Sequence, residues 1–163
     1  MIKGESIEIS TDYQFPNTWR ILRLGNVCRL IDGHKTEGKA VCLDARFLRG
    51  NSSPNYLTKG KLVRNGDYII LVDGENSGEV FAVMTQGYLG STFKQLWISS
   101  EIYVPYVIRF IEFYKDTLRN SKKGAAIPHL NKEIFYNLII GIPPFKEQKR
   151  IVDRINELSQ LLK

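Results

Sequence analysis

Few residues in this sequence have side chains and neighbours suited to catalysis. His34 and His129 could each serve as a general base, but no nucleophile with a supporting acid stands near either one. Cys28 and Cys42 are the only cysteines, and they do not form a close-spaced pair. We expect both to be buried free thiols rather than a disulfide or zinc ligands. The sequence therefore predicts no catalytic residue and no metal site.

Two short motifs look like enzyme signatures but lack the residues that carry the chemistry. Amino-group DNA methyltransferases have an Asn or Asp before two prolines and an aromatic residue, and this side chain accepts a hydrogen bond from the target amine. Here Ile142 takes that position and has no acceptor. Residues 74–78 lack the Gly-Lys-Ser/Thr ending of a phosphate-binding loop, and no Gly-rich loop follows a strand to hold S-adenosylmethionine. We expect no cofactor in this chain.

The charge of the chain is compatible with a nucleic-acid partner. The net charge is +6 and the pI is about 9.3. Residues 45–66 contain five basic side chains and no acidic one, with Asn, Ser and Tyr between them. A solvated loop would have the same composition, so DNA contact and simple exposure both remain open. A second basic cluster, Arg119, Lys122 and Lys123, precedes a small-residue turn at 124–126.

Strands are expected in the first two thirds of the chain. The clearest is 68–72, which is continuously apolar and should be buried on both faces. A Gly-rich turn joins it to a returning strand at 80–84, which predicts a hairpin. Shorter strands are expected at 41–43 and 96–98, and 51–55 reads as a loop.

Helices are expected in the last third. Apolar residues recur at three- and four-residue steps over 104–118, which predicts a buried helix with Pro105 in its first turn. A shorter helix is expected over 131–137. A final helix over 146–163 carries Ile151, Ile155, Leu158 and Leu162 at coiled-coil spacing, and we expect these four to form a helix interface. Packing of this helix on its own domain fits the spacing equally well.

Three regions follow from these elements. Residues 1–14 are polar and could be mobile, residues 15–145 form one domain, and residues 146–163 form a C-terminal helix that begins a coiled-coil spacer. No apolar run is long enough for a transmembrane helix, and the N-terminus lacks the apolar core of a signal peptide. We therefore expect a cytoplasmic protein without membrane contact.

Several motifs, in order, resemble those of a known family. Phe15-Pro16-x-x-Trp19 followed by Leu24-Gly25 resembles the opening of a target recognition domain, and Leu62-Val63 with Gly66-Asp67 resembles its central strand. The closing segments 124–131 and 140–152, with Pro143-Pro144 and then Glu147-Gln148, are the most specific part. The chain thus resembles the DNA-specificity subunits of type I restriction-modification enzymes.

The resemblance implies a non-catalytic, DNA-reading module. Family members typically carry two such domains separated by long helices, and each domain reads half of a split site in double-stranded DNA. Adenine methyltransferase subunits dock on the helices and supply S-adenosylmethionine, and a restriction/translocase subunit joins them. This sequence has one such domain and one short helix. It fits either a half-length subunit that pairs with a second copy through that helix, giving a homodimer, or a piece of a longer polypeptide.

We therefore expect an α+β fold with a mixed or antiparallel sheet, a buried helix and a projecting C-terminal helix. Loop position, charge and polarity single out candidate DNA contacts, which the resemblance itself does not assign. These candidates are Lys35, Arg46, Arg49, Asn51, Asn55, Tyr56, Lys59, Lys61, Asn76, Lys122 and Lys123. The alternative is a basic adaptor that uses its terminal helix to recruit a protein and does not read DNA sequence.

Overall fold

The computed structural model describes residues 15–119 and 128–162, and its contacts group the chain into two compact units. Among the described residues, unit 1 comprises 15–28, 98–114 and 132–162. Unit 2 comprises 29–97, 115–119 and 128–131. Each unit combines helices with strands, which confirms the α+β class. None of the helices within the described ranges is both long and apolar enough to span a bilayer.

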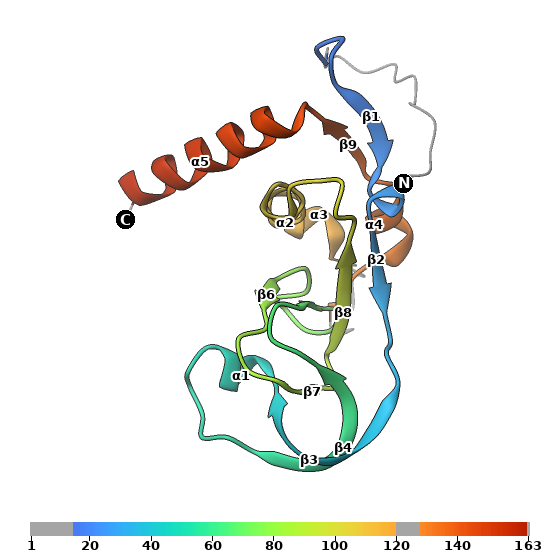
Figure 1. The fold of residues 1–163 in the computed structure, drawn as a ribbon, viewed down its shortest axis with the longest axis vertical. Helices are drawn as coiled ribbons and strands as arrows, with labels where there is room; N and C mark the ends of the chain where they lie inside the picture. The colour runs from blue at the N-terminus through green and yellow to red at the C-terminus, as the bar shows by residue number, and fades with distance from the viewer. Residues whose placement is uncertain (1–14, 120–127, 163) are drawn as a thin grey trace. The chain divides into compact units, whose positions relative to one another are not determined.

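The sheet of unit 1 joins two distant parts of the chain. Strand β1 (Arg20–Arg23) pairs antiparallel with β9 (Ile139–Ile142), and the two lie side by side in Figure 1. Leu22 pairs with Ile140, and both side chains are fully buried. The predicted opening and closing motifs therefore meet in one small sheet.

Gly141 explains why these two motifs fit together. A Cβ atom at this position would lie 2.6 Å from the Phe15 ring and 2.9 Å from the Trp19 ring. The Trp19 amide donates to the Pro16 carbonyl at 3.0 Å, which forms the turn that brings both rings onto β9. Only a residue without a side chain leaves room for this aromatic pair.

The helical segments of unit 1 make contact in two pairs. The 3-10 turn η1 (Leu24–Asn26) contacts helix α4 (Lys132–Asn137), and helix α2 (Val104–Phe113) contacts helix α5 (Phe145–Leu161). Pro105 lies in the first turn of α2 as expected. The expected continuous helix over 104–118 is wrong, because α2 ends at Phe113 and a separate α3 (Lys115–Leu118) follows. Phe113 is also 81% exposed, so the apolar face is not buried along its whole length.

Unit 2 contains a four-stranded sheet in the order β2-β8-β5-β6. Its strands are β2 (Cys28–Ile31), β8 (Phe93–Ile98), β5 (Tyr68–Leu71) and β6 (Val80–Ala82). The predicted hairpin is confirmed, because β5 pairs antiparallel with β6 from Tyr68 opposite Ala82 to Ile70 opposite Val80. The strand expected at 96–98 is the end of the longer β8.

A second, three-stranded sheet in unit 2 closes on itself. Strands β3 (Lys35–Leu43), β4 (Tyr56–Val63) and β7 (Gly87–Leu89) each pair with the other two, β3 with β7 parallel and the other pairs antiparallel. Helix α1 (Ala45–Leu48) follows β3, and the Asp44 carboxylate caps it by accepting from the Phe47 amide at 2.9 Å. One hydrophobic core lies beneath these strands, made of Val41, Leu43, Val63, Ile69, Leu71, Val83 and Phe93.

Candidate nucleic-acid interface

The long β3–β4 ribbon is bent by a bulge that other residues hold in place. The register shifts between Glu37 and Ala40, and Gly38 has a φ of +128°, which a residue with a side chain rarely adopts. The Tyr88 hydroxyl donates to the Gly38 carbonyl at 2.5 Å. The Tyr88 ring also packs on Gly60, where a Cβ atom would lie 2.7 Å from the ring. The buried tyrosine therefore fixes the bulge.

On one side of the bulge, basic side chains gather on the same face of the ribbon. Lys35 lies opposite Lys61, and Glu37 lies opposite Lys59. Because alternate residues of a strand point the same way, the three lysines share a face. They line a groove of about 430 Å³ with Gly60, Ser91 and their neighbours, which we call the lysine groove. The structure thus brings together three of the predicted DNA contacts.

An acidic residue neutralises part of this surface. Asp32 forms an ion pair with Lys94, and its carboxylate lies 4.0 Å from the Lys61 ammonium. Lys35 and Lys59 have no acidic partner within 4.0 Å among the described residues. Glu37 shares their face of the ribbon and lies opposite Lys59, so the three lysines leave this face with a reduced but still positive charge.

On the opposite face of the ribbon lies a second groove of about 430 Å³. The Lys39 ammonium sits 4.9 Å from the centre of the Tyr56 ring, and this ring is 57% exposed. Thr85 and Gln86, from the connection between β6 and β7, complete the rim. Phe47 and Pro54 are among the remaining lining residues. We call this the aromatic groove.

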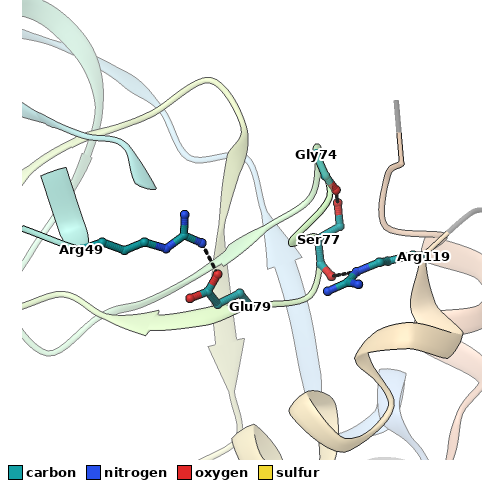
Figure 2. Close-up of polar contacts among 5 residues, drawn as sticks. All are labelled: Arg49, Gly74, Ser77, Glu79 and Arg119. Carbon is teal, nitrogen blue, oxygen red and sulfur yellow. Dashed lines mark hydrogen bonds and ion pairs between the residues drawn. The ribbon is translucent and has the colours of Figure 1, made fainter. Parts of the chain in front are cut away.

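The other predicted contacts among the described residues lie outside the two grooves. Arg46 is exposed on α1, and Asn51 and Asn55 are exposed in the loop that follows it. Arg49 is held by an ion pair with Glu79 and lies over the Phe81 ring at 5.8 Å. Figure 2 shows this pair. Arg49 is therefore less available to a ligand than its place in a basic loop suggested. Lys122 and Lys123 lie outside the described residues.

Asn76 is exposed in a turn that the rest of unit 2 anchors. The Ser77 hydroxyl donates to the Gly74 carbonyl at 2.6 Å, and Arg119 donates to the Ser77 carbonyl at 3.2 Å (Figure 2). The Gly74 amide donates to the Pro128 carbonyl at 2.8 Å. The turn between β5 and β6 is thus a fixed structural feature.

Residues suited to bond-making chemistry do not converge within the described ranges. No group of three or more His, Cys, Asp and Glu side chains there could hold a metal ion. Burial raises the pKa of the Cys28 thiol to about 12, and this thiol points at the Leu24 carbonyl. Cys28 therefore stays protonated near neutral pH. Cys42 is only half-buried, and burial followed by the nearby Asp44 charge raises the pKa of its thiol.

Helix α5 has an inner side and an exposed apolar side. Gln148 and Val152 are buried, whereas Leu158 is 46% and Leu162 is 89% exposed. Ile151 is half-buried, and Ile155 lines an apolar groove of about 660 Å³ together with Trp19, Phe110 and Phe113 of the same unit. Part of the predicted helix interface thus contacts unit 1, and its later positions face solvent.

The lysine residues of the first groove were visible in the sequence, but Lys39, Thr85 and Gln86 were not singled out. Gly38 beside Lys39 was a signal for a bulge. The polar pair Thr85-Gln86 was a signal for a loop between two strands. Neither signal shows that both segments border one groove, because that depends on strand pairing across the chain.

An α+β domain with a basic, bulged β-ribbon is compatible with a nucleic-acid-binding module. A family model described as the type I restriction modification DNA specificity domain matches residues 16–163. The chain therefore belongs to this family, as its motifs predicted.

Similar proteins agree with this assignment. The chain is 29% identical over 175 residues to the type I restriction enzyme MjaVIII specificity subunit of Methanocaldococcus jannaschii. The match covers 98% of this chain and 40% of that protein. This chain thus spans less than half the length of that relative.

Solved structures share the fold. The HsdS subunit from Thermoanaerobacter tengcongensis superposes with a TM-score of 0.68 at 22% identity, over 94% of this chain and 40% of that one. The type I restriction-modification S subunit from M. genitalium gives 0.58 at 16% identity, over 91% and 41%. A chain from a study of assembly and conformational transition of the type I R-M system gives 0.67 at 21% identity, over 94% and 41%.

Proposed function

We propose that this chain reads a DNA sequence and directs a methyltransferase to it, without catalysing a reaction itself. The observation that carries the proposal is the lysine groove, where strand pairing places Lys35, Lys59 and Lys61 on one face. Family membership supports the same conclusion. Residues 15–145 would be the recognition domain and residues 146–163 the start of a helical spacer.

The mechanism is binding through charge and shape. Lysine side chains in the groove neutralise backbone phosphates and release condensed counterions, which supplies affinity and register. Lys35 and Lys59 are the best placed, since no acidic side chain among the described residues lies within 4.0 Å of either. Exposed polar side chains on the neighbouring loops, such as Asn51 and Asn55, are suited to reading base edges.

The partners follow from the family. We propose that adenine methyltransferase subunits dock on α5 and hold S-adenosylmethionine, that a restriction/translocase subunit joins them, and that the site in double-stranded DNA is split. Two copies of this chain pairing through α5 would give a symmetric site. Such an assembly would work in the cytoplasm, where its DNA substrate is found.

The salt dependence of DNA binding tests the proposal. We expect the double variant Lys35→Gln/Lys59→Gln to bind duplex DNA more weakly, with the slope of log K against log salt reduced in magnitude by about 1.8, about 0.9 for each lost phosphate contact. Fluorescence anisotropy with one duplex at four salt concentrations gives the slope.

The matched control is Lys132→Gln/Lys146→Gln, which removes two exposed lysines of unit 1. Its slope should equal that of the unchanged chain. If both double variants changed the slope equally, the lysine groove would have no special role, and binding would be a general effect of net charge.

A second candidate function is a protein adaptor that does not read sequence. The apolar groove beside Ile155 and the exposed leucines of α5 favour it. Nuclease footprinting of the assembled complex separates the two functions. Protection at a defined sequence supports the DNA reader, and protection that ignores sequence supports the adaptor.

A further inference from the structure

We propose that the aromatic groove is where this chain reads bases, and that Gln86 recognises the adenine of an A·T pair in the major groove. This inference rests on the proposed DNA-reading function and assigns specificity to residues outside the lysine groove. Three features of the groove support it: polar side chains without a protein partner, an apolar neighbour, and a backbone that holds them.

The first feature is the hydrogen-bonding capacity of the rim. Thr85 and Gln86 are exposed, and neither makes a side-chain hydrogen bond to another described residue. The amide of a glutamine presents a donor and an acceptor side by side. Adenine offers the complementary pair, the N6 amino group and the N7 acceptor, only in the major groove. The Gln86 amide therefore carries free groups of the types that this base requires.

The second feature is Met84, which precedes this pair in the connection between β6 and β7. Met84 is 77% exposed, so its side chain is accessible to a ligand. The partner of adenine is thymine, and its C5 methyl group also faces the major groove. One short connection thus carries a polar group suited to adenine and an apolar one suited to thymine.

The third feature is the bulge in β3. Bulges next to functional sites redirect a side chain out of the regular strand pattern. Here the bulge at Gly38 places Lys39 over the Tyr56 ring, and the Tyr88 hydroxyl fixes it at 2.5 Å. The groove is therefore formed by backbone geometry that a buried residue enforces.

The two grooves lie on opposite faces of the β3–β4 ribbon. Cys42 and Leu57 line the lysine groove, whereas their strand neighbours Val41 and Tyr56 line the aromatic groove. A two-stranded ribbon such as β3–β4 is narrow enough to enter the major groove of B-DNA. The aromatic face of such a ribbon would meet base edges, and the lysine face would meet a phosphate backbone.

The test is a selection from a duplex DNA library with randomised central positions. The full chain, purified with any subunits that bind it, is compared with Gln86→Ala and Gln86→Glu. We expect the unchanged chain to enrich a motif that contains an adenine. Gln86→Ala should lower the preference for that adenine by about tenfold and leave other positions unchanged. Gln86→Glu should shift the preference there toward cytosine, whose N4 amino group donates to a carboxylate.

The control is Gln160→Ala, which removes an exposed glutamine from α5 and should reproduce the original motif. Circular dichroism confirms that each variant is folded. A motif unaltered by both Gln86 variants, or weakened equally at every position, overturns the assignment of Gln86 while the DNA-reading function stands. If the unchanged chain enriches no motif, the proposed function fails and this inference fails with it.

Discussion

Among single residues, Tyr88 has the largest structural role in the candidate interface. It lies in a three-residue strand, yet its ring packs on Gly60 of β4 and its hydroxyl bonds Gly38 of β3. One buried side chain therefore connects all three strands of the closed sheet. Its hydroxyl is the only part that distinguishes it from phenylalanine, which allows a test of the bulge alone.

We expect Tyr88→Phe to lower the free energy of unfolding by about 1 kcal/mol, the usual net value of one intramolecular hydrogen bond. Urea denaturation followed by circular dichroism measures the change. The control is Tyr68→Phe, because the Tyr68 hydroxyl has no hydrogen-bond partner among the described residues, and this variant should stay within about 0.5 kcal/mol. Equal loss in both variants would mean that the bond to Gly38 does not stabilise the sheet.

Local sequence predicted candidate site residues only from their charge and from their position near turns. Lys35, Lys59 and Lys61 were found because they are basic and lie near turns. Arg49 was found in the same way, but Glu79, distant in sequence, binds it. Whether a basic side chain is free or paired depends on contacts between strands, which local sequence does not contain.

Among the elements, α5 shows how a mostly charged helix is fixed at its start. The buried Gln148 side chain accepts from the Tyr103 amide and donates to the Pro143 carbonyl, both at 2.9 Å. Tyr103 is the residue before α2, and Pro143 follows β9. One amide therefore ties together the beginning of α2, the end of β9 and the first turn of α5, which gives the Glu147-Gln148 motif a structural reason.

We expect Gln148→Ala to destabilise the chain by about 2 kcal/mol, because it leaves a part-buried amide and a buried carbonyl without their partners. Thermal unfolding monitored at 222 nm measures this. Gln160→Ala, on the exposed end of the same helix, should change the stability by less than about 0.5 kcal/mol. A loss that small for Gln148→Ala as well would show that the two bonds do not hold α5.

The elements differ in how well the sequence predicts them. The β5–β6 hairpin was predictable because 68–72 is apolar and a Gly-rich turn follows it. Strand β3 was missed over most of its length, since Lys35–Lys39 is exposed and polar and only its last residues are apolar. The apolar periodicity over 104–118 continues across the end of α2, so it did not predict where the helix ends. Val107 and Ile111 are buried in unit 1, whereas Leu118 is buried in unit 2.

At the scale of the whole molecule, the exposed end of α5 is an apolar surface that a partner could cover. The match of this chain spans 40% of the MjaVIII specificity subunit, so more than half of that relative has no counterpart in this chain. Leu158, Leu161 and Leu162 are exposed at the end of α5, and burial of such residues favours association.

We expect Leu158→Asp/Leu162→Asp to abolish pairing of two copies or binding of a methyltransferase subunit without unfolding the chain, because both side chains are already exposed. Light scattering gives the mass in solution, and a pull-down reports the second partner. The matched control, Ser159→Asp/Gln160→Asp, adds the same charge on the same turn. An unchanged mass together with an intact pull-down for the leucine variant would exclude this end of α5 as an interface.

The pairing of β1 with β9 has a consequence during synthesis of the protein. Residues 20–23 leave the ribosome long before residues 139–142 exist, and at roughly 5–20 residues per second the delay is on the order of ten seconds. Throughout that time β1 has no native pairing partner, although most of unit 2, which lies between β1 and β9 in the sequence, can already collapse. Unit 1 is thus completed last, and β1 is open to wrong pairing or to chaperones until then.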